Sequence, residues 1–231
     1  MNKVLVGKKV IFFDVGYTID YPASGDWMFT CKFNEVAGER IKSCSEEQIR
    51  KARHAGLDYL EKNHIIRDEK EEVANLYQYY KIISDELKLG MTSEEIEAVA
   101  ADRTFNMENY VIYPDAKQVI LRLSDTYRLG IISDTWPSID NQLRTLGVKQ
   151  YFSFTTFSFE LGVFKPDKQM YLDALHKCGC DAKETVFIDD SPVNLEGAAS
   201  VGITPILIAA NSASDVDTPY LKIHTLSELI K

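Results

Sequence analysis

The feature that most constrains the fold of this chain is a change of residue pattern near residue 110. Beyond that point, short apolar runs rich in β-branched residues alternate with stretches of helical periodicity. Strands that alternate with helices in this way are typical of a parallel sheet covered by helices. We therefore predict an α/β fold with a doubly wound, Rossmann-like parallel sheet.

The expected strands and helices of this sheet domain follow one another closely after residue 114. We predict strands at 129–133, 154–157, 185–189 and 204–208. The helices between them are expected at 115–123, 137–146, 167–178 and 192–200. A further apolar run, Lys9–Asp14, lies far upstream. Because a lone strand is not stable, we expect this run to join the same sheet.

The segment between that first strand and residue 110 carries a different pattern. From about residue 27 to 107 every strong signal is helical, and Ser45 with Gln48 has the spacing of a capping box. We predict roughly four helices here, forming an all-α cap domain inserted over the crevice of the sheet. The predicted domains are an α/β catalytic core, 1–18 with 111–231, and a helical cap, 19–110.

Charge and composition exclude some classes of partner. The 231-residue chain has a formal net charge of −9, which does not favour binding to nucleic acid or to an anionic membrane. No run approaches the about 18 apolar residues of a membrane span, and the first residues lack the apolar core of a signal peptide. The four cysteines lack zinc-site spacing, so we expect a soluble cytoplasmic protein with free thiols. The sequence does not indicate an oligomeric state.

Polar residues mark the ends of the expected strands. Asp14 ends the first strand, Ser133 with Asp134 follows a later one, and Asp189 with Asp190 ends another. Taken singly, each of these residues has an ordinary explanation as a turn or cap residue. Because the carboxyl ends of parallel strands meet at one edge of the sheet, their combination indicates a ligand site there.

The chemistry of these residue types is complementary. Neighbouring carboxylates repel one another unless a cation neutralises them, so Asp14, Asp189 and Asp190 predict a site for Mg²⁺. Ser133 and the backbone amides after it can hydrogen-bond a phosphate oxygen. Lys165 can place a positive charge on both the substrate and the attacking group. A carboxylate held near Mg²⁺ and a lysine can act as a nucleophile and form an acyl-phosphate.

Together these motifs resemble those of the haloacid dehalogenase-like hydrolase superfamily. Asp14–Thr18 looks like the first motif of that family, D-x-D-x-T, and Ile131–Ser133 looks like the second. Gly162–Pro166 looks like the third motif, which supplies a lysine, and Phe187–Ser191 looks like the acidic fourth motif. The resemblance covers the whole chain, including the helical insertion after the first motif.

The resemblance implies a metal site and a nucleophile. Asp14 would be the nucleophile and a metal ligand, and Gly16 would give the metal its backbone carbonyl. Asp189 and Asp190 would complete the Mg²⁺ site, with Asn194 as a candidate outer-shell group.

The resemblance also implies a substrate class. Ser133, Asp134 and Lys165 would bind the phosphoryl group, and Lys165 would also act in catalysis. The implied activity is that of a Mg²⁺-dependent phosphatase acting on a small phosphorylated metabolite through an aspartyl-phosphate.

Gly16 departs from the pattern of the family it resembles. In phosphatases of that family this position holds a second Asp, which protonates the leaving oxygen, and such a group is typically worth ~10²–10⁴-fold in rate. Asp20 is a candidate replacement, although we favour a structural role for it in the hinge turn.

Three alternatives therefore stay open. The chain could be a phosphonatase-like hydrolase with Lys32 or Lys42 as a cap lysine, or a dehalogenase-like hydrolase, or a weakly active phosphate-binding or regulatory protein. Because dehalogenases of the family work without metal, the acidic pair Asp189–Asp190 argues against the second alternative.

Overall fold

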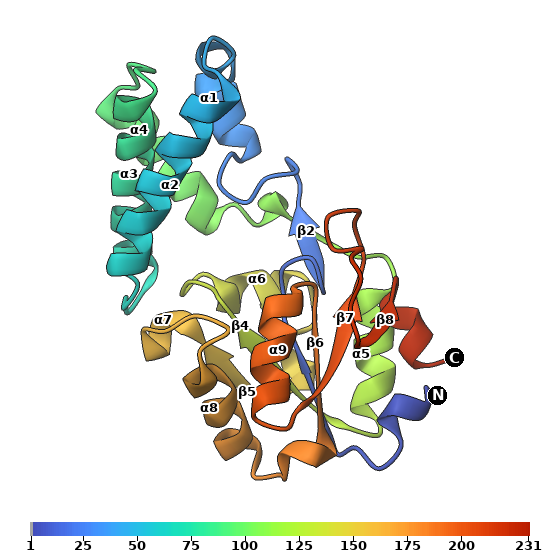
Figure 1. Cartoon of the computed structure of the whole chain (residues 1–231). Helices are drawn as coiled ribbons and strands as arrows, with labels where there is room; N and C mark the ends of the chain where they lie inside the picture. Colours follow the sequence, from blue (N-terminus) through green and yellow to red (C-terminus); the bar gives the residue numbers. More distant parts are fainter. Residues whose placement is uncertain (1) are drawn as a thin grey trace. The chain divides into compact units, whose positions relative to one another are not determined.

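The computed structural model describes residues 2–231, and the internal contacts of the chain divide it into two compact units. We call the first the α/β unit; it comprises Met1–Tyr21, Val111–Thr135 and Asp140–Lys231. The second, the helical unit, comprises Pro22–Tyr110 and Trp136–Ile139. Figure 1 shows the elements of both units along the chain.

The α/β unit is built on a parallel sheet, which confirms the predicted fold class. Within residues 2–231 this sheet has six strands in the order β5-β4-β1-β6-β7-β8. Each neighbouring pair runs parallel. The strands are β1 Val10–Phe13, β4 Arg128–Ser133, β5 Phe152–Phe157, β6 Thr185–Asp189, β7 Thr204–Ile208 and β8 Leu221–Ile223.

The strand β1 lies between β4 and β6, as expected for an apolar run that joins a sheet with later strands. Phe13 is in register with Ile131 of β4 on one side and with Ile188 of β6 on the other. The next backbone amide, that of Asp14, donates to the carbonyl of Ile188 at 2.9 Å. The carboxyl ends of these three strands therefore meet at one edge of the sheet, and this brings their flanking polar residues together.

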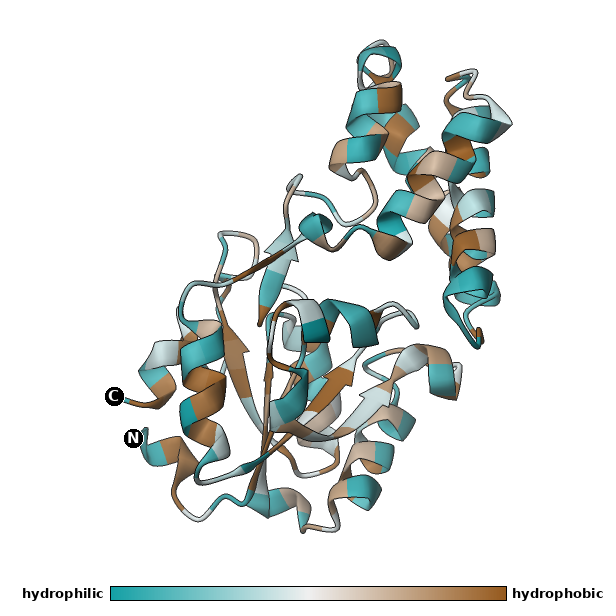
Figure 2. Ribbon diagram, turned by 180° about the vertical axis from the view of Figure 1, so that it is seen from behind, coloured by the Kyte–Doolittle hydropathy of each residue, from teal (hydrophilic) through white to brown (hydrophobic). Residues whose placement is uncertain are grey.

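Helices cover both faces of this sheet. Val10 and Phe12 share a buried cluster with apolar residues of α8 and α9, so Ile11 and Phe13 point to the opposite face by strand alternation. In Figure 2 the strands of this unit are coloured mainly as apolar. This pattern is expected of strands buried on both faces. The helices are α5 Ala116–Ser124, α6 Ile139–Thr145, α7 Ser158–Leu161, α8 Lys168–Cys178 and α9 Pro192–Ser200.

The helical unit contains the predicted all-α segment. Its helices are α1 Cys31–Ile41, α2 Glu46–Lys62, α3 Glu69–Glu86 and α4 Ser93–Phe105. The predicted capping box is present, because the Ser45 hydroxyl accepts from the amide of Gln48 and the Gln48 side chain accepts from the amide of Ser45. The unit has its own core, in which Phe33, Tyr79 and Tyr80 are fully buried. Among the described residues, none of the helices combines the length and the apolar character that crossing a membrane requires.

Some elements differ from the sequence-based expectations. The strands β2 Asp20–Pro22 and β3 Tyr110–Ile112 pair as a two-stranded sheet where the chain passes between the units. These strands and β8 are each three residues long, too short to show an alternating pattern. The helix expected at 137–146 is shorter, Ile139–Thr145, because the turn that precedes it takes up Trp136 to Ser138.

Candidate active site

The candidate site is centred on the buried ammonium group of Lys165. Its Nζ atom lies 2.7 Å from Asp14 Oδ1 and 2.7 Å from Asp189 Oδ2. The three residues are at most 8% exposed. Lys165 lies in the connection between α7 and α8, whereas the two carboxylates follow or end neighbouring strands. The sheet topology thus brings together a cation and two acids that are far apart in sequence.

The Asp189 carboxylate is held by groups of its own loop. Its Oδ1 atom accepts from the backbone amide of Ser191 at 2.8 Å, and the Asn194 side-chain amide lies 3.1 Å from both carboxylate oxygens. Asn194 stands in the first turn of α9, a helix that starts directly after this loop. Asp189 is therefore held by contacts within its strand–loop–helix segment in addition to its ion pair with Lys165.

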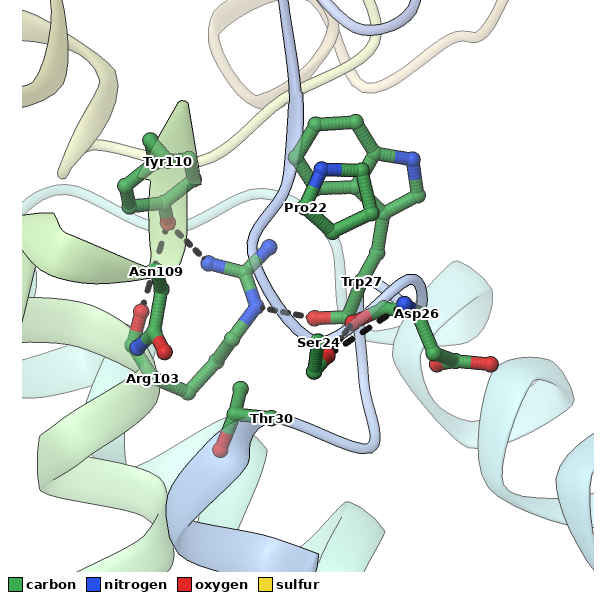
Figure 3. A pocket seen from close by; sticks show the side chains of 8 residues that line it. All are labelled: Pro22, Ser24, Asp26, Trp27, Thr30, Arg103, Asn109 and Tyr110. Carbon is green, nitrogen blue, oxygen red and sulfur yellow. Dashed lines mark hydrogen bonds between the residues drawn. The ribbon is translucent and has the colours of Figure 1, made fainter. Parts of the chain in front are cut away.

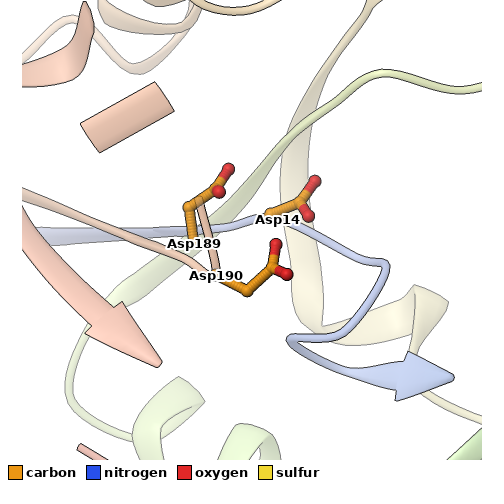
Figure 4. Close-up of side chains that lie close together, drawn as sticks. All are labelled: Asp14, Asp189 and Asp190. Atoms are coloured by element: carbon orange, nitrogen blue, oxygen red, sulfur yellow. The ribbon is translucent and has the colours of Figure 1, made fainter. Parts of the chain in front are cut away.

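Asp14, Asp189 and Asp190 together form a cluster of carboxylates. One carboxylate oxygen from each residue lies within 4.8 Å of the corresponding oxygens of the other two. Figure 4 shows the three side chains. Carboxylate oxygens are the ligands that Mg²⁺ and Ca²⁺ prefer, and a close acidic set is unfavourable without a cation. The residues thus fit the metal site that the sequence predicts.

The pKa values of the clustered residues also indicate a site for a cation. Burial, opposed by the charge of Lys165 and reinforced by that of Asp189, raises the pKa of Asp14 to about 7. Burial and the charge of Asp189 raise the pKa of Asp190 to about 6. Although burial acts to lower it, the pKa of Lys165 is raised by Asp14, Asp189 and Asp134, so the lysine stays charged. One lysine does not neutralise the acidic cluster, and a divalent cation would supply the missing positive charge.

The remaining predicted residues lie at the same edge of the sheet. Ser133 is buried at the end of β4. The Asp134 carboxylate accepts from the backbone amide of Lys165 at 3.0 Å. Burial raises the pKa of Asp134, with the charge of Lys165 opposing the rise. Asp134 therefore positions the backbone of Lys165, and contact of Ser133 or Asp134 with a substrate stays a prediction.

The loop after Asp14 has an unexpected backbone feature. Within residues 2–231 the positions with left-handed backbone include Tyr17, with φ 54°, but not Gly16. Gly16 instead forms an isolated parallel bridge with Asp20. The φ angle of Gly16 therefore does not require glycine, whereas Tyr17 occupies a conformation that favours glycine.

Asp20 is part of the structure of this loop. It is 0% exposed, and its Oδ2 atom accepts from the side-chain amide of Gln142 at 2.5 Å. Because this carboxylate is buried and hydrogen-bonded, it favours the interpretation that Asp20 stabilises the loop over the one in which it replaces the missing acid at position 16.

Sequence reasoning missed Ser214. Its hydroxyl lies 3.1 Å from Asp190 Oδ2, so it orients the outermost carboxylate of the cluster. The residue lies in an irregular connection between β7 and β8. A lone serine in such a segment carries no pattern that points to a site, and only the fold places it there.

Comparison with known proteins gives a family and a fold. A family model described as "Hydrolase: haloacid dehalogenase-like hydrolase" matches residues 9–202. The glyceraldehyde 3-phosphate phosphatase of Methanothermobacter thermautotrophicus is 29% identical over 100 residues, which is 42% of this chain and 44% of that protein. This chain thus matches less than half the length of that curated relative.

Solved structures with the same fold include proteins of two different chemistries. A 2-haloacid dehalogenase from Pseudomonas syringae pv. Tomato DC3000 gives a TM-score of 0.64 at 23% identity, covering 96% of both chains. A HAD phosphatase from Thermococcus onnurineus gives a TM-score of 0.63 at 22% identity, covering 96% of this chain and 95% of that chain. At these identities the likeness establishes the fold alone.

Proposed function

Because this chain belongs to the haloacid dehalogenase-like hydrolases, we propose that it is a Mg²⁺-dependent phosphatase that acts on a small phosphorylated molecule. The observation that carries the proposal is the cluster of Asp14, Asp189 and Asp190 around the ammonium group of Lys165. The name of the partial relative, a phosphatase of glyceraldehyde 3-phosphate, supports a small phosphorylated substrate.

Asp14 is the proposed nucleophile. Lys165 holds Oδ1 of its carboxylate at 2.7 Å, which leaves Oδ2 for attack on phosphorus. Attack forms the Oδ2–P bond and breaks the bond from phosphorus to the leaving oxygen, which departs with the bonding electron pair and takes up a proton. Water then attacks the aspartyl-phosphate, releasing inorganic phosphate and restoring the Asp14 carboxylate.

The residues proposed to hold Mg²⁺ are Asp14, Asp190 and the backbone carbonyl of Gly16, with Asp189 beside them. When bound, the ion supplies positive charge that screens the phosphoryl oxygens from the acids. Lys165 supplies a further positive charge next to Asp14, and Ser133 is proposed to donate a hydrogen bond to a phosphoryl oxygen. A dianionic group can then approach a cluster of acids that would otherwise repel it.

Gly16 bears on which phosphate esters the protein hydrolyses. Without a carboxylate at this position the leaving oxygen must be protonated by another group or leave unprotonated. Substrates with good leaving groups, such as aryl or acyl phosphates, are therefore expected to react faster than alkyl phosphates.

Two of the alternatives receive less support. A phosphonatase-like reaction needs a lysine amine free to attack a carbonyl, but Lys32 and Lys42 each form an ion pair with a glutamate of their own helix region. A dehalogenase-like reaction needs no metal, so it leaves the carboxylate cluster without a role. The weakly active regulatory alternative rests on Gly16 and is decided by activity measurements.

The proposal is tested by the rate of p-nitrophenyl phosphate hydrolysis with and without Mg²⁺. We expect Mg²⁺-dependent turnover that Asp14→Asn lowers by about 10⁴-fold or more, as when a catalytic nucleophile is removed. Asp167→Asn is a matched control, because this exposed aspartate caps α8 outside the cluster. Turnover that is unchanged in Asp14→Asn, with the fold intact by circular dichroism, would remove the covalent mechanism.

A second experiment addresses Gly16 directly. Gly16→Asp restores a carboxylate at a position whose backbone is not left-handed, so we expect faster hydrolysis of alkyl phosphates, by up to the ~10²–10⁴-fold of a general acid. Gly16→Ala is the control, because it adds a Cβ without an acid. If Gly16→Ala folds normally and Gly16→Asp shows no gain on any ester, proton delivery does not limit this protein.

A further inference from the structure

Two cysteines of the α/β unit lie on either side of one glycine at the end of α8. Cys178 is the last residue of this helix, Gly179 follows it, and Cys180 comes next. Both side chains are free thiols. Cys178 is 3% exposed and packs among core residues of the sheet, α8 and α9, whereas Cys180 is partly exposed. The pair therefore combines one thiol that a reagent reaches with one that the core shelters.

The backbone of Gly179 brings the two cysteines close enough for a disulfide. Its φ of 62° and ψ of 29° are left-handed helical angles, and its amide donates to the carbonyl of Leu175 at 3.0 Å. The separation of the two Cα atoms that flank a residue depends on the backbone angles of that residue and is unchanged in the mirror image. It is therefore that of a helical turn, about 5.5 Å, inside the range of about 4.4–6.8 Å found for disulfides.

The side chains of the two cysteines also interact. Burial raises the pKa of Cys178 most, the backbone amide of Cys180 opposes this rise, and the side chain of Cys180 adds to it. The last contribution requires the two sulfur atoms to lie near each other. The Cys178 thiol donates to the carbonyl of Leu175 at 3.3 Å, a neutral group of its own helix. A buried thiol with a raised pKa is unreactive by itself, so Cys178 is suited to the second step of an oxidation rather than the first.

Cys180 accepts a hydrogen bond from a charged group. Nη2 of Arg128 donates to Cys180 Sγ at 3.0 Å and to the carbonyl of Cys178 at 2.6 Å. The ring of Phe154, whose centroid lies 5.5 Å from the guanidinium carbon, packs against Arg128. A positively charged donor stabilises a thiolate, and the thiolate is the species that peroxides oxidise. Partial exposure and a guanidinium partner thus make Cys180 the thiol suited to the first step.

The other charged groups of this region form ion pairs. Lys9 pairs with Glu184 at 2.7 Å, and the pKa of Lys9 is raised mainly by Glu184 and to a smaller extent by Cys180. Asp181, which follows Cys180, lies 3.7 Å from Lys183. A second cation is therefore within electrostatic reach of the Cys180 sulfur, while the acids nearby are balanced by lysines.

From this arrangement we propose that Cys178 and Cys180 form a reversible disulfide in response to hydrogen peroxide. The Cys180 thiolate attacks one oxygen of the peroxide and the O–O bond breaks, which gives a sulfenic acid and a hydroxide that takes up a proton. The Cys178 sulfur then attacks the Cys180 sulfur and the S–O bond breaks, and the sulfenic oxygen leaves as water with the proton of the Cys178 thiol. The two thiols lose two electrons, and one peroxide is reduced to two molecules of water.

The thiol pair lies far along the sheet from the carboxylate cluster. Arg128 is the first residue of β4 and Ser133 is the last, so the pair and the candidate active site are at opposite ends of this strand. The proposal does not rest on phosphatase chemistry, because oxidation of the pair is measured without turnover. A thiol reductant reverses a disulfide but not the higher oxidation states of cysteine, so the disulfide also protects Cys180 from irreversible oxidation.

The first test uses the wild-type protein, treated with hydrogen peroxide and then alkylated. Trypsin cleaves after Lys177 and Lys183, so both cysteines fall in the peptide 178–183. We expect mass spectrometry to show that this peptide loses two hydrogen atoms and regains them with dithiothreitol. Cys44 is the internal comparison, because it is also partly exposed but its Sγ atom lies 3.7 Å from a neutral group, the carbonyl of Leu87. A peptide that keeps its hydrogens, or a Cys44 thiol that is oxidised as fast as the pair, overturns the proposal.

Replacement of Arg128 tests the activation of Cys180. In Arg128→Met we expect the disulfide to form about tenfold more slowly, since a hydrogen bond from a charged donor contributes about that factor. Arg122→Met is the matched control, because Arg122 is an exposed arginine in the last turn of α5, and it should leave the rate unchanged. Circular dichroism verifies that both variants fold. Equal rates in Arg128→Met and the wild type would contradict the assignment of Cys180 as the activated thiol.

Single-cysteine variants determine which thiol reacts first. In Cys178→Ser the attack on peroxide still occurs but no disulfide follows, so we expect dimedone to label Cys180 as a sulfenic acid. In Cys180→Ser we expect Cys178 to stay reduced, because it is buried and its pKa is raised. Labelling of Cys178 in place of Cys180, or of neither residue, overturns the proposed sequence of steps.

Discussion

The two units of this protein each bury a cation, and they compensate its charge in opposite ways. In the α/β unit, Lys165 is 8% exposed and contacts two carboxylates at 2.7 Å. In the helical unit, Arg103 is 7% exposed and contacts the carbonyl of Trp27 and the hydroxyl and ring of Tyr110 (Figure 3). Equal burial thus accompanies an excess of acid around one cation and the lack of a paired acid around the other.

The difference shows how the net charge of a buried cluster indicates what it binds. Asp14, Asp189 and Asp190 exceed the charge of Lys165, and the pKa values of Asp14 and Asp190 are raised to about 7 and about 6. A cation relieves such a cluster, as we propose for Mg²⁺. At Arg103 no carboxylate of the described residues forms an ion pair, and the charge of Glu72 acts to raise the pKa of Arg103 from a distance.

Removal of the Lys165 charge should have the largest effect on stability. In Lys165→Met two buried carboxylates lose their cation, and we expect a loss of about 3–5 kcal/mol in unfolding free energy without Mg²⁺. Lys168→Met, at an exposed lysine just beyond in α8, should change it by less than ~0.5 kcal/mol. Urea denaturation of both variants measures the difference. Equal stability of the two variants would show that the acids of the cluster are not held charged by Lys165.

Binding of Mg²⁺ should change the free energy of unfolding by a smaller amount. If Mg²⁺ occupies the carboxylate cluster, it should stabilise the wild-type protein by about 2.7 kcal/mol at 100 times its Kd. Asp190→Ala should erase this gain, because it removes one of the clustered ligands, whereas Asp217→Ala, at an exposed aspartate, should retain it. Melting curves at increasing Mg²⁺ give the result, and a gain that persists in Asp190→Ala would place the metal elsewhere.

A pH-dependent effect on stability concerns a buried group of the helical unit, His64. Burial lowers the pKa of His64 to about 4 from an ordinary value of 6.5, so the unfolded chain takes up its proton at a higher pH than the folded protein does. Its contribution to stability is fully present above pH 6.5 and is lost as the pH falls toward 4. The slope is at most about 1.4 kcal/mol per pH unit, the limit for one proton.

The His64 effect is read as a difference between two proteins in saturating Mg²⁺, so that the carboxylate cluster contributes equally to both. Urea denaturation of the wild type and of His64→Gln between pH 4 and 7 should show a shallower pH dependence in the variant. Parallel curves over this range would mean that His64 titrates alike in the folded and unfolded chain.

The layout of the fold follows from patterns that are local in the sequence. Strand and helix periods are local, so the strands at 185–189 and 204–208 and the helix at 192–200 could be read to the residue. The carboxylates of the site could be located because a polar residue after an apolar strand is itself a local signal. Their convergence followed from the general rule that parallel strands end at a common edge.

The partners of each buried charge, in contrast, depend on how distant segments pack together. The position of Lys165 between Asp14 and Asp189, and that of Ser214 on Asp190, depends on loops whose paths carry no periodic pattern. Arg103 gave no signal in the sequence, because an arginine in a helix normally extends into solvent. Its burial and its lack of a paired acid arise from packing α4 against a distant loop, and a pattern that is local in sequence does not contain such contacts.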